Sequence, residues 1–299
     1  MSDLFPGFDH RRIPVEGIEI NARIGGAGPP LLLLHGYPET HACWHRVAPK
    51  LAGSFSVVLP DLPGYGDSAF IEPDPENRNY SKRRTAATMA GLMQQLGWSR
   101  FAVVGHDRGA RVAYRLALDR ADCVERLALF DILPTIEEWA IFDRSEAMAT
   151  FHWPFLAQEG GLPETLIARE PDFFLRYLMS RWAGDLTRID PEALADYLRC
   201  FRRDKVIRAT CADYRAGATA DVADDAADRA VGRRIACPVL VLWGSGRSDL
   251  LPVWRRWAED LSGAQLACGH FLQEEAPQAV LARLLPFLGQ GLPGRVAPG

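Results

Sequence analysis

Gly105-His106-Asp107-Arg108-Gly109 is the stretch that decides the fold of this 299-residue chain. It follows an apolar run, residues 101–104, and precedes a helix-like segment, residues 110–118. A Gly-x-nucleophile-x-Gly pattern between a strand and a helix is typical of a nucleophile elbow, in which two glycines allow a turn that exposes the middle side chain. That residue is usually serine, whereas here it is Asp107. Because a carboxylate needs no base to deprotonate it, the pattern predicts direct attack on a saturated carbon.

The composition is ordinary for a globular protein, with 48% hydrophobic and 24% charged residues. A net charge of −4 without a basic block argues against nucleic acid as a partner, and an anionic substrate would need cations placed locally. The sequence shows no signal peptide and no stretch able to span a bilayer. The six cysteines show neither close pairs nor metal-ligand spacing, so we expect free thiols and no metal. These features predict a cytoplasmic protein that needs no cofactor and has no membrane partner.

Five apolar runs have the length and character of buried parallel strands: residues 31–34, 55–59, 101–104, 127–130 and 239–243. Helical patterns separate the first four, and residues 12–15 and 18–24 predict a hairpin at the sheet edge. This alternation predicts an α/β fold with a mostly parallel sheet and helices on both faces.

The alternation breaks after Pro134, where amphipathic, aromatic-rich segments replace the strands. We expect a helical cap insertion over the sheet, and we interpret the Ala/Asp run 218–228 as a solvated loop or weak helix. The predicted domains are a first core part, a helical cap, a second core part and a flexible tail: residues 1–134, 135–233, 234–289 and 290–299.

His270 follows Gly269 late in the chain, in the position of a catalytic base. It would activate water to hydrolyse an ester formed on Asp107. Two acids compete to orient its imidazole: Asp131, which ends the run 127–130, and Asp249, which lies in a loop. We favour Asp131 because a strand end fixes a side chain better than a loop does, but position alone leaves Asp249 open.

The turn His35-Gly36-Tyr37-Pro38 follows the first long apolar strand. Its backbone N–H at Tyr37, together with that of Arg108, forms a candidate oxyanion hole for ester hydrolysis. We expect His35 to lie at the pocket.

Arg108 and Arg111 fall in the first turn of the predicted helix, where the helix dipole disfavours cations. Their spacing places both on one face beside Asp107, so they could clamp a substrate carboxylate bidentately. In the insertion, His152, Trp153 and Tyr214 offer polar donors on apolar bodies, although spacing alone favours core packing for them. Trp182 is a weaker candidate of the same kind.

With these residues in view, the chain resembles the fluoroacetate (haloacetate) dehalogenases of the α/β-hydrolase superfamily. The resemblance rests on residues 105–111, 130–135, the pair His152-Trp153 and residues 211–217. It implies that Asp107 is the nucleophile, His270 the base and Asp131 the orienting acid. It further implies that Arg108 and Arg111 bind the substrate carboxylate. It assigns halide binding to His152, Trp153 and Tyr214, and pocket lining to Trp182.

The resemblance implies hydrolytic dehalogenation of a small 2-haloacid, giving a 2-hydroxy acid and halide, and it makes a homodimer possible. One departure is Tyr37, where the family pattern has phenylalanine. Two alternatives stay open: an epoxide hydrolase with the same Asp/His machinery, and a catalytically silent ligand-binding protein of this fold. For the first, cap tyrosines would protonate the epoxide oxygen, the candidates being Tyr177, Tyr197 and Tyr214.

Overall fold

The computed structural model describes residues 4–183 and 185–290. Within this part of the chain, eight strands form one sheet in the order β1-β2-β4-β3-β5-β6-β7-β8. The strands are β1 Asp9–Val15, β2 Ile18–Gly25, β3 Pro30–Leu34, β4 Ser56–Pro60, β5 Phe101–His106, β6 Val124–Phe130, β7 Val239–Trp243 and β8 Leu261–Gln265. β2 pairs antiparallel with β1 and β4, and all other neighbours pair in parallel.

The apolar runs predicted from sequence are confirmed as the central strands. Every residue of β5 and β7 is buried, as expected for strands covered on both faces. The predicted hairpin is β1–β2, whose mostly exposed first strand forms one edge of the sheet. The sheet is therefore mixed and mostly parallel, in agreement with the predicted α/β class.

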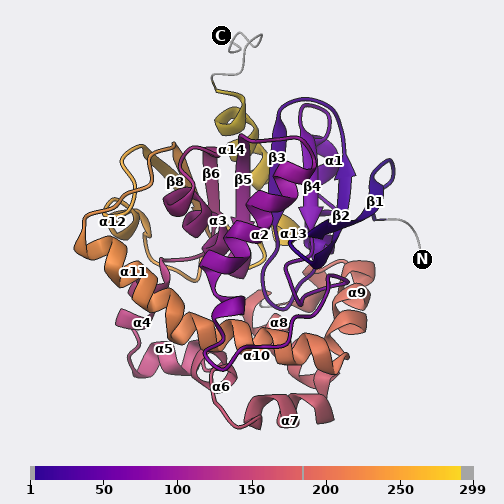
Figure 1. Cartoon of the computed structure of the whole chain (residues 1–299), viewed down its shortest axis with the longest axis vertical. Helices are drawn as coiled ribbons and strands as arrows, with labels where there is room; N and C mark the ends of the chain where they lie inside the picture. The colour runs from indigo at the N-terminus through magenta and orange to yellow at the C-terminus, as the bar shows by residue number, and fades with distance from the viewer. Residues whose placement is uncertain (1–3, 184, 291–299) are drawn as a thin grey trace.

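Helices cover both faces of this sheet. Figure 1 shows α2 and α3 in front of the strands and α14 behind them, with the insertion helices below the sheet. The helices outside the insertion are α1 Ala48–Leu51, α2 Lys82–Gln95, α3 Asp107–Asp119, α12 Leu251–Trp254, α13 Leu272–Glu275 and α14 Pro277–Gly289, with short 3-10 turns η1 His41–Trp44 and η2 Arg78–Tyr80.

Between β6 and β7 the described residues contain helices and no strand. These are α4 Thr135–Ala140, α5 Arg144–Ala149, α6 His152–Leu156, α7 Leu162–Arg169, α8 Pro171–Ala183, η3 Leu186–Arg188, α9 Pro191–Phe201, α10 Asp204–Ala218 and α11 Ala220–Ala230. They lie beyond the carboxyl ends of the parallel strands, which is where ligands bind in open α/β sheets (Figure 1). We retain 135–233 as the proposed bounds of this cap.

Helix α11 corrects one prediction. The Ala/Asp run was expected to be solvated, but Asp221, Asp225 and Asp228 are buried. Asp225 and Asp228 receive hydrogen bonds from Arg115 of α3 at 3.1 and 2.5 Å. The buried acids of this helix are spaced three or four residues apart and so share one face, which pairs with cations of the core. Ion pairs rather than an apolar stripe therefore hold the helix in place.

No helix in the described ranges is long and apolar enough to cross a membrane. All six cysteines are free thiols, and five of them are buried. Of the tail predicted over residues 290–299, all but the first residue lie outside the described residues.

Candidate active site

Asp107 occupies the sharp turn that the elbow pattern predicts, between β5 and α3. Its φ is +45°, a left-handed conformation that non-glycine residues rarely adopt. The two flanking glycines are required by close packing, since a Cβ at Gly105 would lie 2.5 Å from the Cα of Ala110 and one at Gly109 would lie 2.4 Å from the carbonyl oxygen of His35. The strained turn holds the Asp107 side chain toward the insertion.

One oxygen of the Asp107 carboxylate is fixed. The Tyr37 backbone N–H donates to Oδ2 at 2.9 Å, which leaves Oδ1 without a hydrogen-bond partner among the described residues. Burial alone would raise the pKa of Asp107, but the positive charges of His270, His106 and the two arginines outweigh burial and hold this pKa below its ordinary value. Asp107 is therefore ionised across the neutral pH range.

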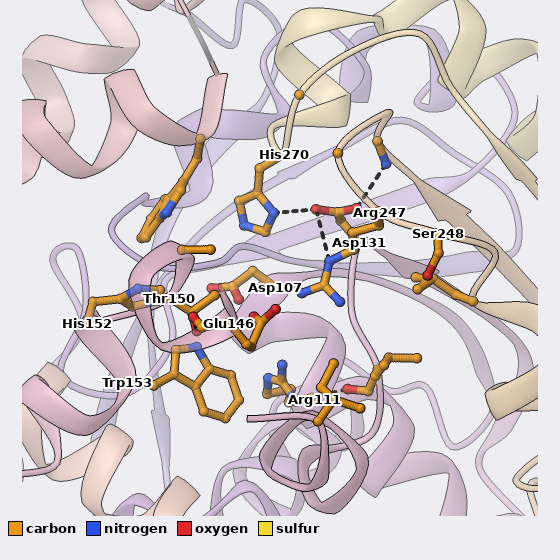
Figure 2. A pocket seen from close by; sticks show the side chains of 18 residues that line it. Asp107, Arg111, Asp131, Glu146, Thr150, His152, Trp153, Arg247, Ser248 and His270 are labelled. Carbon is orange, nitrogen blue, oxygen red and sulfur yellow. Dashed lines mark hydrogen bonds and ion pairs between the residues drawn. The ribbon is translucent and has the colours of Figure 1, made fainter. Parts of the chain in front are cut away.

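His270 lies beside Asp107 and is oriented by Asp131. His270 Nδ1 and Asp131 Oδ2 are 2.6 Å apart, and Asp131 Oδ1 accepts from the Gly244 N–H at 2.9 Å (Figure 2). Asp249 lies elsewhere, exposed, where it accepts from the Leu251 N–H at the start of α12. The geometry thus separates the two acids that position alone left open, and Asp131 is the one at the imidazole.

These groups open onto a cavity of about 380 Å³ between the strand ends and the insertion. Figure 2 shows Asp107 and His270 on one side of it, with His152 and Trp153 opposite. The lining residues that concern the chemistry are Asp107, Arg111, Asp131, His152, Trp153, Trp182, Arg247 and His270. Asp107, Arg111 and Asp131 of this lining are themselves buried, which strengthens the electrostatic interactions among them.

Arg108 is fully buried and held by an acid that sequence reasoning had not assigned. Its Nε donates to Asp213 Oδ2 and its Nη2 to the Asp213 carbonyl oxygen, both at 2.7 Å. Asp213 also pairs with Lys82 and accepts from the Tyr65 hydroxyl, and although burial opposes ionisation, Arg108 and Lys82 lower its pKa to about 2. Arg108 does not line the cavity, yet its Nη1 is buried without a partner among the described residues.

Arg111 lines the cavity and is also partly satisfied. Its Nη1 donates to the Leu133 carbonyl oxygen at 2.9 Å and to Thr135 Oγ1 at 3.3 Å, while Nε is buried without a partner within the described ranges. Each of the two guanidiniums therefore leaves one nitrogen unused. Only Arg111 presents its unused nitrogen from the cavity lining, so the described lining does not form the expected clamp by both arginines.

The predicted halide residues form one aromatic group above Asp107. The Tyr214 ring lies 5.6 Å from that of His152 and 6.1 Å from that of Trp153. Its face lies 4.2 Å from the Arg108 guanidinium carbon. Burial lowers the pKa of His152 to about 3, so its imidazole is neutral, and its Nδ1 has no partner in the part of the chain that the structure describes. The ring of Trp182, 4.6 Å from that of His152, completes the wall.

Tyr37, the departure from the family pattern, lies behind this group. Its ring is 5.3 Å from that of Tyr214 and stacks on His152 at 6.4 Å. The Tyr37 hydroxyl is buried without a partner among the described residues. The extra oxygen therefore adds a polar atom next to the aromatic group and not within the cavity lining.

Two expectations fail. His35 does not line the cavity: the Leu62 N–H donates to its Nε2 at 3.0 Å, so Nδ1 carries the proton and donates to the Gly36 carbonyl oxygen. Of the three tyrosines proposed for epoxide chemistry, Tyr177 is 40% exposed on the cap surface and Tyr197 donates to Glu274. Only Tyr214 lies near Asp107.

His106, immediately before Asp107, was not predicted. Its ring nitrogens lie 2.8 Å from Glu39 Oε2 and 2.8 Å from the His270 carbonyl oxygen. Both neighbours are acceptors, so both nitrogens must carry protons. Burial alone would lower the pKa of His106, but Glu39 raises it to about 9. A positively charged histidine thus lies next to the nucleophile. The only indication of it in the sequence is that a histidine occupies the position before Asp107 in the elbow.

The comparisons with known proteins agree with this geometry. A family model described as alpha/beta hydrolase fold matches residues 29–277. The chain belongs to the α/β-hydrolase family. It is 40% identical to a fluoroacetate dehalogenase from Burkholderia sp over 97% of both chains. It is 32% identical to a soluble epoxide hydrolase from Corynebacterium sp. (strain C12), over 93% of this chain and 96% of that one.

Among solved structures, the chain is similar to ALR0039 from Nostoc sp PCC 7120. The two share 48% identity with a TM-score of 0.92, over 95% of this chain and 98% of that one. As an α/β hydrolase with relatives in both the dehalogenase and the epoxide hydrolase groups, the protein is related to enzymes of two substrate classes. The substrate must therefore be argued from this chain's own site.

Proposed function

We propose that this α/β hydrolase cleaves the carbon–halogen bond of small 2-haloacids such as haloacetate, through an ester on Asp107. The observation that carries the proposal is the pair of buried, unpartnered guanidinium nitrogens, Arg108 Nη1 and Arg111 Nε, on the helix that begins at the nucleophile. A buried donor without an acceptor is costly, and a substrate carboxylate in the cavity would accept from Arg111 Nε, because Arg111 is the member of the pair that lines the cavity. Arg108 lies behind that lining and adds its positive charge. A neutral haloalkane or epoxide would leave the Arg111 donor unsatisfied.

The first step is displacement of halide. Arg111 holds the substrate carboxylate so that its α-carbon faces Asp107, with the charge of Arg108 behind it, which turns a bimolecular reaction into an intramolecular one. Because the Tyr37 N–H holds Oδ2, the attacking atom is Oδ1. The Oδ1–carbon bond forms as the carbon–halogen bond breaks, and the halide leaves with the bonding electron pair.

The departing halide would be bound by His152, Trp153 and Tyr214. The neutral His152 ring can donate one N–H without bringing a charge that would compete with the arginines. Fluoride is strongly hydrated, so a water-poor site with several donors matters most for that ion. The resemblance to fluoroacetate dehalogenases supports this assignment.

The second step is hydrolysis of the ester. His270, held by Asp131, takes a proton from water, and the hydroxide adds to the carboxyl carbon of Asp107. The oxyanion forms on Oδ2, where the Tyr37 N–H already donates. The bond from that carbon to Oδ1 then breaks, the product alkoxide takes the proton from His270, and Asp107 ionises to release one proton.

Trapping the intermediate tests this chemistry. In His270→Asn with chloroacetate, we expect a stable adduct on Asp107 by intact mass and peptide mapping. Asp107→Asn treated in the same way is the matched control and should stay unmodified. A clean His270→Asn protein would count against the covalent route.

The alternative is an epoxide hydrolase, favoured by the Corynebacterium relative and by a cap tyrosine near Asp107, Tyr214. Halide release from fluoro-, chloro- and bromoacetate, measured beside turnover of styrene oxide and a haloalkane, distinguishes the two. Turnover of styrene oxide without halide release from the haloacetates would identify the protein as an epoxide hydrolase. Tight ligand binding without any product would indicate a silent binding protein.

A further inference from the structure

One carboxylate in the insertion contacts both halves of the site. Glu138 of α4 is 2% exposed, and the Leu133 N–H donates to its Oε2 at 3.2 Å. The same Oε2 receives Arg111 Nη2 at 3.4 Å, and Oε1 receives Arg247 Nη2 at 2.8 Å. A single buried acid is therefore shared between two cations that reach it from different parts of the core.

The two cations lie next to groups that act in different steps of the proposed reaction. Arg111 lines the cavity with its unpartnered Nε, where we place the substrate carboxylate. Arg247, in the loop after β7, also lines the cavity, and its Nε lies 3.9 Å from Asp131 Oδ2 (Figure 2). That oxygen is the one bound to His270 Nδ1.

We propose that Glu138 is a positioning residue that couples the carboxylate anchor, Arg111, to the Asp131–His270 pair through Arg247. The inference rests on the proposed function for the meaning of the anchor and the base, but its contacts do not depend on which substrate is used. Glu138 fixes Arg111 in place, and it also neutralises Arg247 next to the imidazole that must become positive when water is activated.

The direction of each effect follows from Coulomb's law. Without the Glu138 charge, less negative charge offsets Arg247, although Asp131 and Glu146 still act on it, and protonation of His270 is disfavoured. Without Arg247, that opposing cation is gone and protonation becomes easier. Loss of Glu138 and loss of Arg247 therefore shift the titration of His270 in opposite directions, which a general loosening of the fold would not do. The titratable or charged groups around His270 and in its cavity are Asp107, Arg111, Asp131, Glu146, His106, His152, Arg247 and Glu275.

The test compares Glu138→Gln and Arg247→Met in the full-length enzyme by NMR titration of the His270 ring. We expect the midpoint to move by about one pH unit to lower pH in Glu138→Gln and to higher pH in Arg247→Met. Binding of glycolate, an unreactive carboxylate, should weaken several-fold in Glu138→Gln, because Arg111 loses the acid that holds it. Glu138→Asp should recover part of the glycolate affinity.

Glu137→Gln is the matched control. Glu137 is the neighbouring buried acid of α4, but it pairs with Arg256 and Trp257, away from the cavity. It should change neither the titration nor glycolate binding. Shifts of equal sign in Glu138→Gln and Arg247→Met, or an unchanged titration in both, would overturn the inference. If the wild-type enzyme released no halide but the two variants still shifted the His270 titration in opposite directions, the result would count against the proposed function alone.

Discussion

Helix α3 carries three buried arginines, and those in its first turn are paired differently from the one in its second half. In the middle of the helix, Arg115 donates to Asp119, Asp225 and Asp228, so its charge is surrounded by carboxylates. In the first turn, Arg108 and Arg111 each keep one buried nitrogen without a partner in the described ranges. Each first-turn arginine has an acid as ion-pair partner, Asp213 or Glu138, but its remaining buried N–H can still bind an acceptor. The same residue type thus fastens the insertion at one end and, we propose, binds substrate at the other.

The largest expected effect on activity comes from replacing an arginine in the first turn of α3. Arg111→Met should lower kcat/KM for chloroacetate roughly 100- to 1,000-fold, because a buried charged contact to the substrate is lost. The unfolding free energy should change much less, since Glu138 keeps Arg247 as its partner and the neighbouring carbonyl and hydroxyl oxygens can take water. Steady-state kinetics and urea denaturation on the same preparation check this, and a large loss of stability with unchanged kinetics would reverse the assignment.

Arg115→Met should show the opposite pattern. The buried Asp225 would lose its ion pair with Arg115, while Asp119 and Asp228 would keep only pairs with the half-exposed Arg83 and Arg233, so we expect the unfolding free energy to fall by about 3–5 kcal/mol. The protein that remains folded should keep its KM for chloroacetate. Denaturation midpoints with kinetics at low temperature provide the measurement. A KM that rose as strongly as in Arg111→Met would show that the two ends are not distinct.

His106 sharpens the comparison, because it precedes α3 and yet both of its nitrogens are paired. By the same rule it should act mainly on stability. Its pKa is raised to about 9 in the folded state, so its contribution is full below pH 6.5 and is lost as the pH rises through 9. We expect up to about 3 kcal/mol of stability to disappear over that window. His106→Gln should flatten the dependence of urea midpoints on pH, and an unchanged slope would argue against the charged form.

The smallest effect is expected at the exposed edge of the Arg115 cluster. Asp119 pairs with Arg83, whose side chain is 46% exposed, as well as with Arg115. Solvent screens such pairs, so Asp119→Ala should cost about 1 kcal/mol or less. Thermal denaturation of Asp119→Ala and of Asp228→Ala, which removes a buried acid, compares the two losses of stability. Equal losses would mean that burial does not govern the strength of these pairs.

The sequence predicted the elements whose signal is local. Apolar runs gave the strands, and the elbow glycines gave the position of Asp107, since both patterns arise from neighbours along the chain. Sequence also brought His270 and Asp131 together, because strand ends converge at one edge of the sheet.

What sequence could not predict depends on partners far along the chain. Arg108 meets Asp213, and Arg111 meets Glu138, across an insertion whose packing no periodicity encodes. The acidic face of α11 was misjudged for the same reason, because a run of aspartates predicts solvation unless the opposing arginines are known. His35 failed because a histidine at a strand end serves equally well as a loop support, as its bond from Leu62 shows.

The hydrogen bond from the Tyr37 N–H to Asp107 Oδ2 has a consequence for the fate of individual atoms. With that oxygen held in place, the reacting oxygen departs in the hydroxy acid, and solvent supplies its replacement. In ¹⁸O-enriched water the first product molecule would carry no label, while the enzyme itself would acquire it. The nucleophile is then a renewable part of the protein, rebuilt from water in every cycle.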